Sequence, residues 1–365
     1  MRNLSRASAV LRAPQLSSAA RSNIAISRSF HYSPLKSAIA HPITAHGPPP
    51  KAPVPAPEFG ERVERRKKQA ELIEKGKEAQ TQPSKPATAL KKRFWKDVNV
   101  RKQPEGYQVL LDTRPVRTPA KTILTIPPTK PQLAYAIALE WDLLTSAQQA
   151  LKHHLIPLTS ITARAEDIVR EDAQGETTTR DEILRTVMRY LDTDTLLCWV
   201  PEKEAEPAEE GEQRRETLRE LQMRVAQEII GFLSTAVWPG IEIKPILNSD
   251  SILPVSQPQA TKDVIRGWIS GLHAYDLAAL ERGVLAGKSL LVAVRLLVEW
   301  SENFRHLQRP GQKRFGIEEA AYASSLEVTW QTDMWGEVED THDVDKEDLR
   351  RQLGSVVLLV SGKTS

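Results

Sequence analysis

The sequence predicts an α+β fold, in which a small β-rich N-terminal domain precedes a mainly α-helical C-terminal domain. Between Val98 and Ile126, short runs of alternating apolar and polar residues are separated by turns containing proline or glycine, which indicates antiparallel strands. From residue 131 onward, apolar residues recur every three or four positions, which indicates amphipathic helices. The chain has 365 residues, a length that suits about two domains. We therefore expect a β-rich domain with a helix over residues 91–170 and a helical domain over residues 171–365.

The segment before these domains has a different composition. Residues 1–57 contain seven bases and no acidic residue. The bases are Arg2, Arg6, Arg12, Arg21, Arg28, Lys36 and Lys51. An N-terminus rich in Arg and Ser and free of acids is typical of a mitochondrial presequence, which we expect over residues 1–30. Residues 31–90 are rich first in proline and then in charge, and we predict a disordered linker there.

The charge, the cysteine content and the apolar stretches of the chain exclude several classes of protein. The whole sequence has a formal charge of +3, but residues 58–365 hold 43 bases and 47 acids, a net charge of −4. This mildly acidic body argues against nucleic-acid binding. Cys198 is the single cysteine of the sequence, so an intramolecular disulfide is excluded. The longest apolar stretch, Gly283–Trp300, is interrupted by Lys288 and Arg295, so we expect no membrane insertion.

The individual elements follow from local patterns. Strands are predicted around Val98–Val100, over Tyr107–Leu111 and over Ile123–Ile126. Thr129 is predicted to cap a helix that has Pro131 in its first turn. Further helices are predicted over Thr159–Arg170, from Thr179 with Glu182 as its capping partner, and over Leu218–Phe232, Val264–Leu280, Ser289–Asn303 and Ile317–Met334. The short apolar run Val356–Val360 fits a buried strand.

No catalytic motif is convincing. Gly287-Lys288-Ser289 is similar to the end of a phosphate-binding loop, but the position that must then be glycine is Arg282. We predict that this tripeptide joins two helices and that Ser289 caps the second. The acidic stretch Trp335–Asp345 has a single histidine, and its spacing matches neither a zinc helix nor a calcium loop. The potential metal ligands in that stretch are Glu339, His342, Asp343 and Asp345.

We therefore expect no catalytic residue, no bound cofactor and no metal. An alternative stays open at this point, namely a matrix metal-dependent hydrolase. Its site would combine carboxylates with one histidine, and the candidate residues are Asp192, Asp194, His342 and Asp343.

Several unusual segments occur together in a characteristic order. They are Arg93–Val98, Leu111–Ala120, Glu140–Asp142, Pro157–Ser160, Tyr190–Leu197, Ser325–Glu327, Trp330-Gln331 and Trp335–Asp345. In this order the chain resembles the mitochondrial ATP synthase F1 assembly factor 2 family, whose members bind the alpha subunit. The resemblance covers roughly residues 91–360, and Thr113 and Leu143 depart from the usual Gly and Gln of the family.

The resemblance implies a non-enzymatic chaperone of the mitochondrial matrix. Its partner would be the unassembled alpha subunit, which it would protect from aggregation and pass to the beta subunit. The functionally critical glutamate of the family matches Glu327, which alternatively is a solvated carboxylate or a partner in an intramolecular ion pair. The predicted partner-binding residues are Glu327, Gln331, Trp335, Glu337 and Glu339. We expect a monomer, because the sequence has no coiled-coil heptad.

Overall fold

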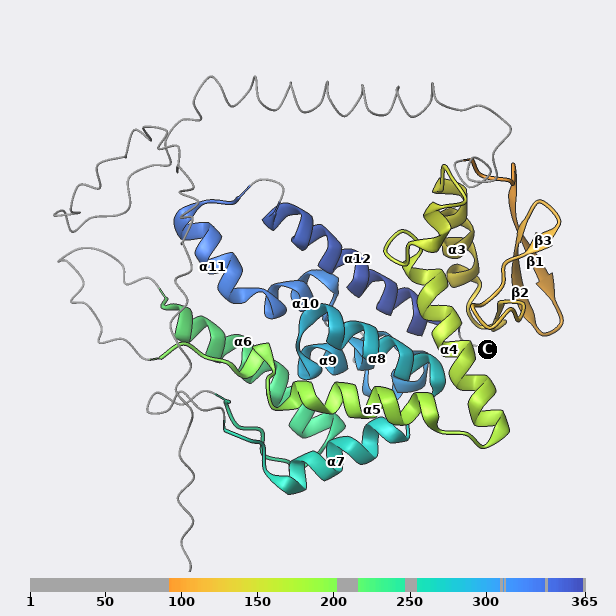
Figure 1. Ribbon diagram of the computed structural model, residues 1–365. Coiled ribbons are helices and arrows are strands. Elements are labelled where there is room, and N and C mark those ends of the chain that lie inside the picture. The colour runs from red at the N-terminus through yellow and green to blue at the C-terminus, as the bar shows by residue number, and fades with distance from the viewer. Residues whose placement is uncertain are drawn as a thin grey trace, which may run out of the picture. The chain divides into compact units, whose positions relative to one another are not determined.

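The computed structural model describes residues 92–201, 216–246, 255–308, 311, 313–338 and 341–363 (Figure 1). The predicted presequence (1–30) and linker (31–90) lie outside the described residues, and so does Glu339. The described part has a small antiparallel sheet followed by helices, which confirms the predicted α+β class. The division into domains at residue 170 stays a prediction.

The sheet is built around one strand. Strand β2 (Gly106–Leu111) pairs along one edge with β1 (Val98–Gln103). Along its other edge it pairs with two very short strands, β3 (Arg114–Pro115) and β4 (Thr125–Ile126). The turn into β2 requires glycine, because a Cβ at position 106 would lie 2.1 Å from the Ile126 carbonyl oxygen.

Helix α3 (Pro131–Leu143) packs on this sheet through a fully buried face that includes Leu133 and Ile137. Trp95 is buried beside it and meets Trp141 edge to face, with ring centroids 5.5 Å apart. Helix α4 (Pro157–Gln174) follows after a loop that contains the short helix η1 (Gln149–Leu151), and α4 contacts both α3 and the helices beyond it (Figure 1).

The helical part is organised around two buried helices, α8 (Ala274–Gly287) and α9 (Leu290–Trp300). A helix that is apolar on nearly all sides belongs in a core, and α8 is in contact with α4, α5, α9 and α12. The helices around this pair are α5 (Thr178–Leu191), α6 (Leu218–Phe232), α7 (Gln259–Ser270), α10 (Ile317–Ser324), α11 (Leu326–Trp335) and α12 (His342–Val360). The shorter helical turns are η2 (Thr195–Leu197), η3 (Leu233–Val237) and η4 (Glu302–Leu307).

Several predicted helices are confirmed and others are corrected. The helix over Leu218–Phe232 is confirmed, and so is the join at residues 287–289, where the Ser289 hydroxyl accepts a hydrogen bond from the Val292 N–H. The single helix predicted over Val264–Leu280 is wrong, because α7 ends at Ser270 and α8 begins at Ala274. The single helix predicted over Ile317–Met334 is also two helices, divided at Ser325.

The predicted strand over Val356–Val360 is wrong, because these residues form the last turns of α12. The caps predicted at Thr129 and Thr179 are wrong as well. Helix α3 has Lys130 at its N-cap position without a side-chain cap, and α5 has Thr177 there. The hydroxyl of Thr179 instead donates to the Glu171 carboxylate, at 2.7 Å.

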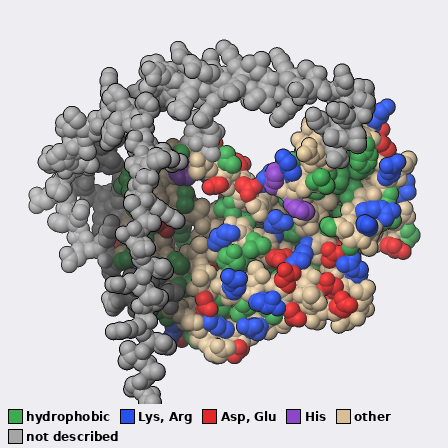
Figure 2. All heavy atoms as spheres, in the orientation of Figure 1, with side chains coloured by type: hydrophobic (Ala, Val, Ile, Leu, Met, Phe, Trp, Pro, Cys, Tyr) green, Lys and Arg blue, Asp and Glu red, His purple; other side chains and the backbone are tan. Residues whose placement is uncertain are grey.

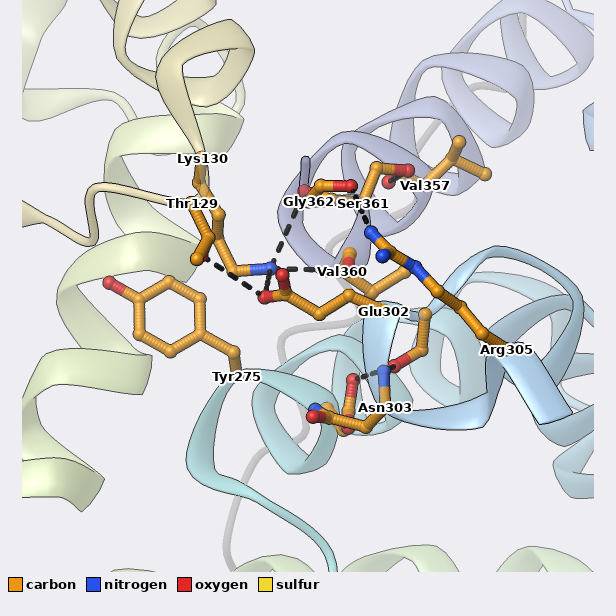
Figure 3. A network of polar contacts seen from close by, with 12 residues as sticks. Thr129, Lys130, Tyr275, Glu302, Asn303, Arg305, Val357, Val360, Ser361 and Gly362 are labelled. Atoms are coloured by element: carbon orange, nitrogen blue, oxygen red, sulfur yellow. Dashed lines mark hydrogen bonds and ion pairs between the residues drawn. The ribbon is translucent and has the colours of Figure 1, made fainter. Parts of the chain in front are cut away.

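A buried polar network joins the start of α3 to the end of α12 (Figure 3). The Lys130 ammonium lies 2.7 Å from a Glu302 carboxylate oxygen and donates to the carbonyl of Val360 at 3.1 Å. Only 3% of Lys130 is exposed. The backbone N–H of Lys363 donates to the Thr129 carbonyl at 2.7 Å. Because a carbonyl at a helix C-terminus lacks an intrahelical donor, Lys130 provides the end of α12 with a charged cap.

Across the described ranges, no helix has both the length and the apolar character needed to cross a bilayer.

Candidate partner-binding surface

Helix α11 carries Glu327, the residue that the family resemblance singles out as an expected partner-binding glutamate. It begins after Ser325, where the backbone leaves the helical region (φ −124°, ψ 23°). Its only buried residue is Leu326, and it also contacts α6. Farther along the helix, Trp330 is only half-buried and Met334 is exposed. Helix α11 therefore leaves the core along its length.

A tight turn follows α11. Gly336 has φ +89° and ψ 158°, a conformation that only glycine adopts readily. Two hydrogen bonds then close the turn, because the Val338 N–H donates to the His342 Nδ1 at 3.0 Å and the His342 N–H donates to the Val338 carbonyl at 3.2 Å. His342 therefore has a structural role at the start of α12.

Large apolar side chains are exposed on α11 and on this turn. Trp335 is 72% exposed and Val338 is 57% exposed. Exposed Val328, Met334 and Val344 accompany them. A concentration of exposed large apolar residues within one short segment of the chain marks a candidate interaction surface. Sequence analysis missed the valines, although an apolar Val338 within an acidic stretch was a usable signal.

Carboxylates lie close to these apolar residues in the chain. Glu327 is exposed and accepts a hydrogen bond from Gln331 Nε2 at 3.2 Å, so these two predicted residues are brought together. The Glu337 carboxylate lies 3.9 Å from the Lys346 ammonium, which is a loose and exposed ion pair. We call the group Glu327, Val328, Gln331, Met334, Trp335, Glu337 and Val338 the α11 surface.

Glu327 also acts on the neighbouring core. The pKa of the Cys198 thiol is raised, first by burial and then by the negative charges of Asp194 and Glu327. A raised pKa keeps the thiol protonated and unreactive, so Cys198 is not an activated nucleophile. The half-buried Cys198 packs against the core.

The hydrolase alternative does not fit the structure. Asp194 is fully buried and accepts hydrogen bonds from the backbone N–H groups of Leu196 and Leu291, and burial raises its pKa to about 6. Asp192 forms an ion pair of 2.7 Å with Lys262. These two carboxylates therefore serve separate structural contacts. The residues that the structure describes contain no group of three His, Cys, Asp or Glu side chains placed to hold a metal ion.

Comparison with known proteins identifies the family. Residues 92–234 match the ATP12 chaperone protein family. Protein atp12 from Schizosaccharomyces pombe, named as mitochondrial, is 32% identical over 269 residues, which cover 73% of this chain and 81% of that protein. The chain belongs to the ATP12 chaperone family. The ATP12 protein of Saccharomyces cerevisiae, also named as mitochondrial, is 32% identical over 278 residues, covering 73% of this chain and 82% of its own length.

Solved structures agree on the ATP12 fold. The crystal structure of Atp12 from Paracoccus denitrificans has a TM-score of 0.52 at 22% identity, covering 73% of this chain and 98% of that one. A putative chaperone from Agrobacterium tumefaciens has a TM-score of 0.51 at 21% identity, covering 77% and 91%. The matching family is named for a chaperone and not for an enzyme, which confirms the non-enzymatic prediction.

Proposed function

We propose that this ATP12-family chain is a chaperone for assembly of the mitochondrial ATP synthase, and that it binds the unassembled alpha subunit of the F1 sector. In this proposal it prevents aggregation of the alpha subunit and passes it to the beta subunit. The observation that carries the proposal is the α11 surface, which exposes apolar side chains in a protein of a chaperone family.

The chemistry of the α11 surface suits such a partner. A subunit awaiting assembly exposes apolar area that its neighbour will later cover, and Trp335 and Val338 offer matching apolar area. Aromatic residues contribute strongly to protein interfaces, so Trp335 is the proposed anchor. Glu327 and Glu337 would orient the partner through basic groups at the rim, because charges at a rim give specificity more than affinity.

Release needs no nucleotide in this mechanism. A chaperone that binds the free subunit is displaced when a tighter partner occupies the same surface, because each ligand shifts the equilibrium toward its own complex. The beta subunit is the proposed competitor. We also propose that the protein acts in the mitochondrial matrix, and the mitochondrial names of the two yeast relatives support this location. We propose in addition that it acts as a monomer.

A light-scattering experiment tests the function. Isolated alpha subunit is warmed until it aggregates, with and without an equimolar amount of the purified chain, in the absence of nucleotide and metal. We expect the chain to suppress aggregation and added beta subunit to reverse the association. Undiminished aggregation, or protection that appears only when a metal is added, would contradict the proposal.

Two variants test the α11 surface. Trp335→Ala and Glu327→Lys change exposed side chains, so their thermal unfolding should match that of the wild type. Each should weaken alpha-subunit capture, Trp335→Ala by about 30-fold or more, because an interface aromatic anchor contributes about 2 kcal/mol or more. The matched controls are Val264→Ala, an exposed apolar residue on α7, and Glu176→Lys, an exposed carboxylate between α4 and α5. Equal effects of variants and controls would remove α11 from the proposal.

A further inference from the structure

A second apolar surface lies on α3, at a distance along the chain from α11. Tyr135, Leu139 and Leu143 follow one another at intervals of four residues, so they share one face of the helix. They are 63%, 58% and 71% exposed. The opposite face of α3 holds the buried Leu133 and Ile137. Figure 2 shows hydrophobic side chains gathered over α3, with Lys, Arg and His side chains beside them.

The outward face of α3 leads into a groove. This groove has a volume of about 460 Å³ and lies between α3, the loop that precedes α4, and α12. Leu143, Leu144, Leu155, Leu158 and Leu358 give it an apolar lining. A volume of this size lies within the usual range for ligand pockets, roughly 300–1,000 Å³. We call the groove and the outward residues of α3 the α3 groove.

The charges at the rim of the α3 groove are not balanced. The Glu140 carboxylate faces inward and accepts hydrogen bonds from the N–H groups of Leu158 and Thr159, so both of its oxygens already have partners within the protein. The loop residue Lys152 lies between Gln149 and Leu155, which both line the groove. Its exposed ammonium has no hydrogen bond or ion pair to any side chain or carbonyl within the described ranges. Arg351 also lines the groove, and its guanidinium is paired with Asp348. The charge without a described partner, next in the chain to lining residues, is therefore the positive charge of Lys152.

The geometry selects one mode of recognition. The walls of the α3 groove are helices and a loop, and they offer no open strand edge to which an extended peptide would add. An apolar groove between helices accepts instead the apolar face of an amphipathic helix. Unpaired Lys152 favours a helix whose polar side carries carboxylates.

We propose that the α3 groove is a second docking site, which binds an acidic amphipathic helix of the client protein. The identity of the partner as the client rests on the proposed function, whereas the groove and the charge of Lys152 are features of this chain alone. Two separate contacts, one at α11 and one at α3, would hold the client at two points. Two linked contacts raise the overall affinity for the client, because once the first contact has formed the second forms within the same complex.

A peptide probe tests the groove directly on the full chain. The probe is a synthetic 18-residue helix with leucines along one face and glutamates along the other, carrying a fluorescent label for anisotropy measurements. A second peptide has lysines in place of the glutamates. We expect the acidic peptide to bind about two- to fivefold more tightly than the basic one, because it pairs with the exposed Lys152. Equal affinities, or a preference for the basic peptide, would overturn the proposed partner chemistry.

Variants locate the binding. Leu139→Ser and Leu143→Ser should each weaken the acidic peptide about tenfold, which is the effect of losing one buried leucine contact. Val264→Ser, on α7, is the matched control and should bind normally. The bases of residues 1–57 are present in every variant, so they do not account for a loss that is specific to α3. Unchanged binding by both α3 variants would overturn the proposal, and so would a dimer, seen by sedimentation, that Leu143→Ser abolishes.

The alpha-subunit assay separates this proposal from the proposed function. If the wild type protects the alpha subunit and Leu143→Ser protects it equally well, the second docking site is wrong and the chaperone function stands. If the wild type gives no protection, the proposed function fails, while the peptide measurement still decides whether the groove binds an acidic helix. Reduced protection by Leu143→Ser, with an unchanged thermal unfolding curve, supports both.

Discussion

Replacement of Lys130 by methionine tests how strongly the start of α3 is joined to the end of α12. Methionine keeps an unbranched apolar side chain but removes the ammonium, with its contact of 2.7 Å to Glu302 and its hydrogen bond of 3.1 Å to the Val360 carbonyl. Removing one member of a buried ion pair costs about 3–5 kcal/mol, because the charge that remains has no partner.

The structure places the expected loss at the lower end of that range. Glu302 is 19% exposed and keeps the Thr129 hydroxyl at 3.4 Å, so water and this hydroxyl solvate part of its charge. We expect Lys130→Met to lower the free energy of unfolding by about 3 kcal/mol. In a folded body of this size, that loss corresponds to a fall in Tm of about 6–12 °C.

The assay is urea unfolding followed by circular dichroism, with a double variant as the decisive comparison. Lys130→Met combined with Glu302→Gln should be more stable than Lys130→Met alone, because no unpaired charge remains. A loss below about 1 kcal/mol for Lys130→Met would refute the reasoning. A double variant that is less stable than the single one would refute it as well.

Two further predictions concern a buried acid and a turn. Burial raises the pKa of Glu140 from 4.5 to about 7, against the lowering effect of its hydrogen bonds, so the folded state holds this proton at a higher pH than the unfolded state does. The stability contributed by the proton is complete below about pH 4.5 and is lost as the pH rises to about 7, so Glu140→Gln should gain about 2–3 kcal/mol relative to the wild type between pH 5 and pH 8. Urea unfolding at both pH values measures this gain, and parallel pH dependence of the two proteins would contradict it. Gly336→Ala should weaken alpha-subunit capture several-fold, because alanine at φ +89° is strained by about 1–3 kcal/mol and the turn that follows Trp335 must move. Gly240→Ala, at φ +85° in a turn outside the α11 surface, is the control in the same scattering assay, and equal capture by both variants would speak against a role for the turn.

The predicted caps illustrate what local patterns leave undecided. The sequence signature for a cap was present at Thr129, yet its hydroxyl lies near Glu302, which is 173 residues away. Thr179 likewise binds Glu171 rather than the start of its own helix. A Thr side chain satisfies either a local N–H or a distant carboxylate, and only the folded chain determines which of the two is within reach.

Apolar runs were ambiguous for a related reason. Val356–Val360 is too short for its pattern to distinguish a buried strand from a buried helix. It extends the helical pattern of α12, in which Leu353, Val356 and Val360 are buried. The break between α7 and α8 was missed because apolar periodicity continues across Gly271 and Leu272 while the backbone of His273 is extended.

The fold class and the family of this protein were predictable from the sequence alone. The periodicity of the apolar residues indicated a small sheet followed by helices, and an ordered set of short motifs indicated the family, because both kinds of information are local. Which apolar face is covered is not local information. Helix α3 has apolar side chains on two faces, and the pattern alone does not separate Leu133 and Ile137 from Leu139 and Leu143. Packing of the sheet against the first face buried it, and the absence of a described neighbour on the second left the exposed stripe on which the α3 groove depends. The same holds for α11, where Trp335 is exposed because that helix leaves the core after Leu326.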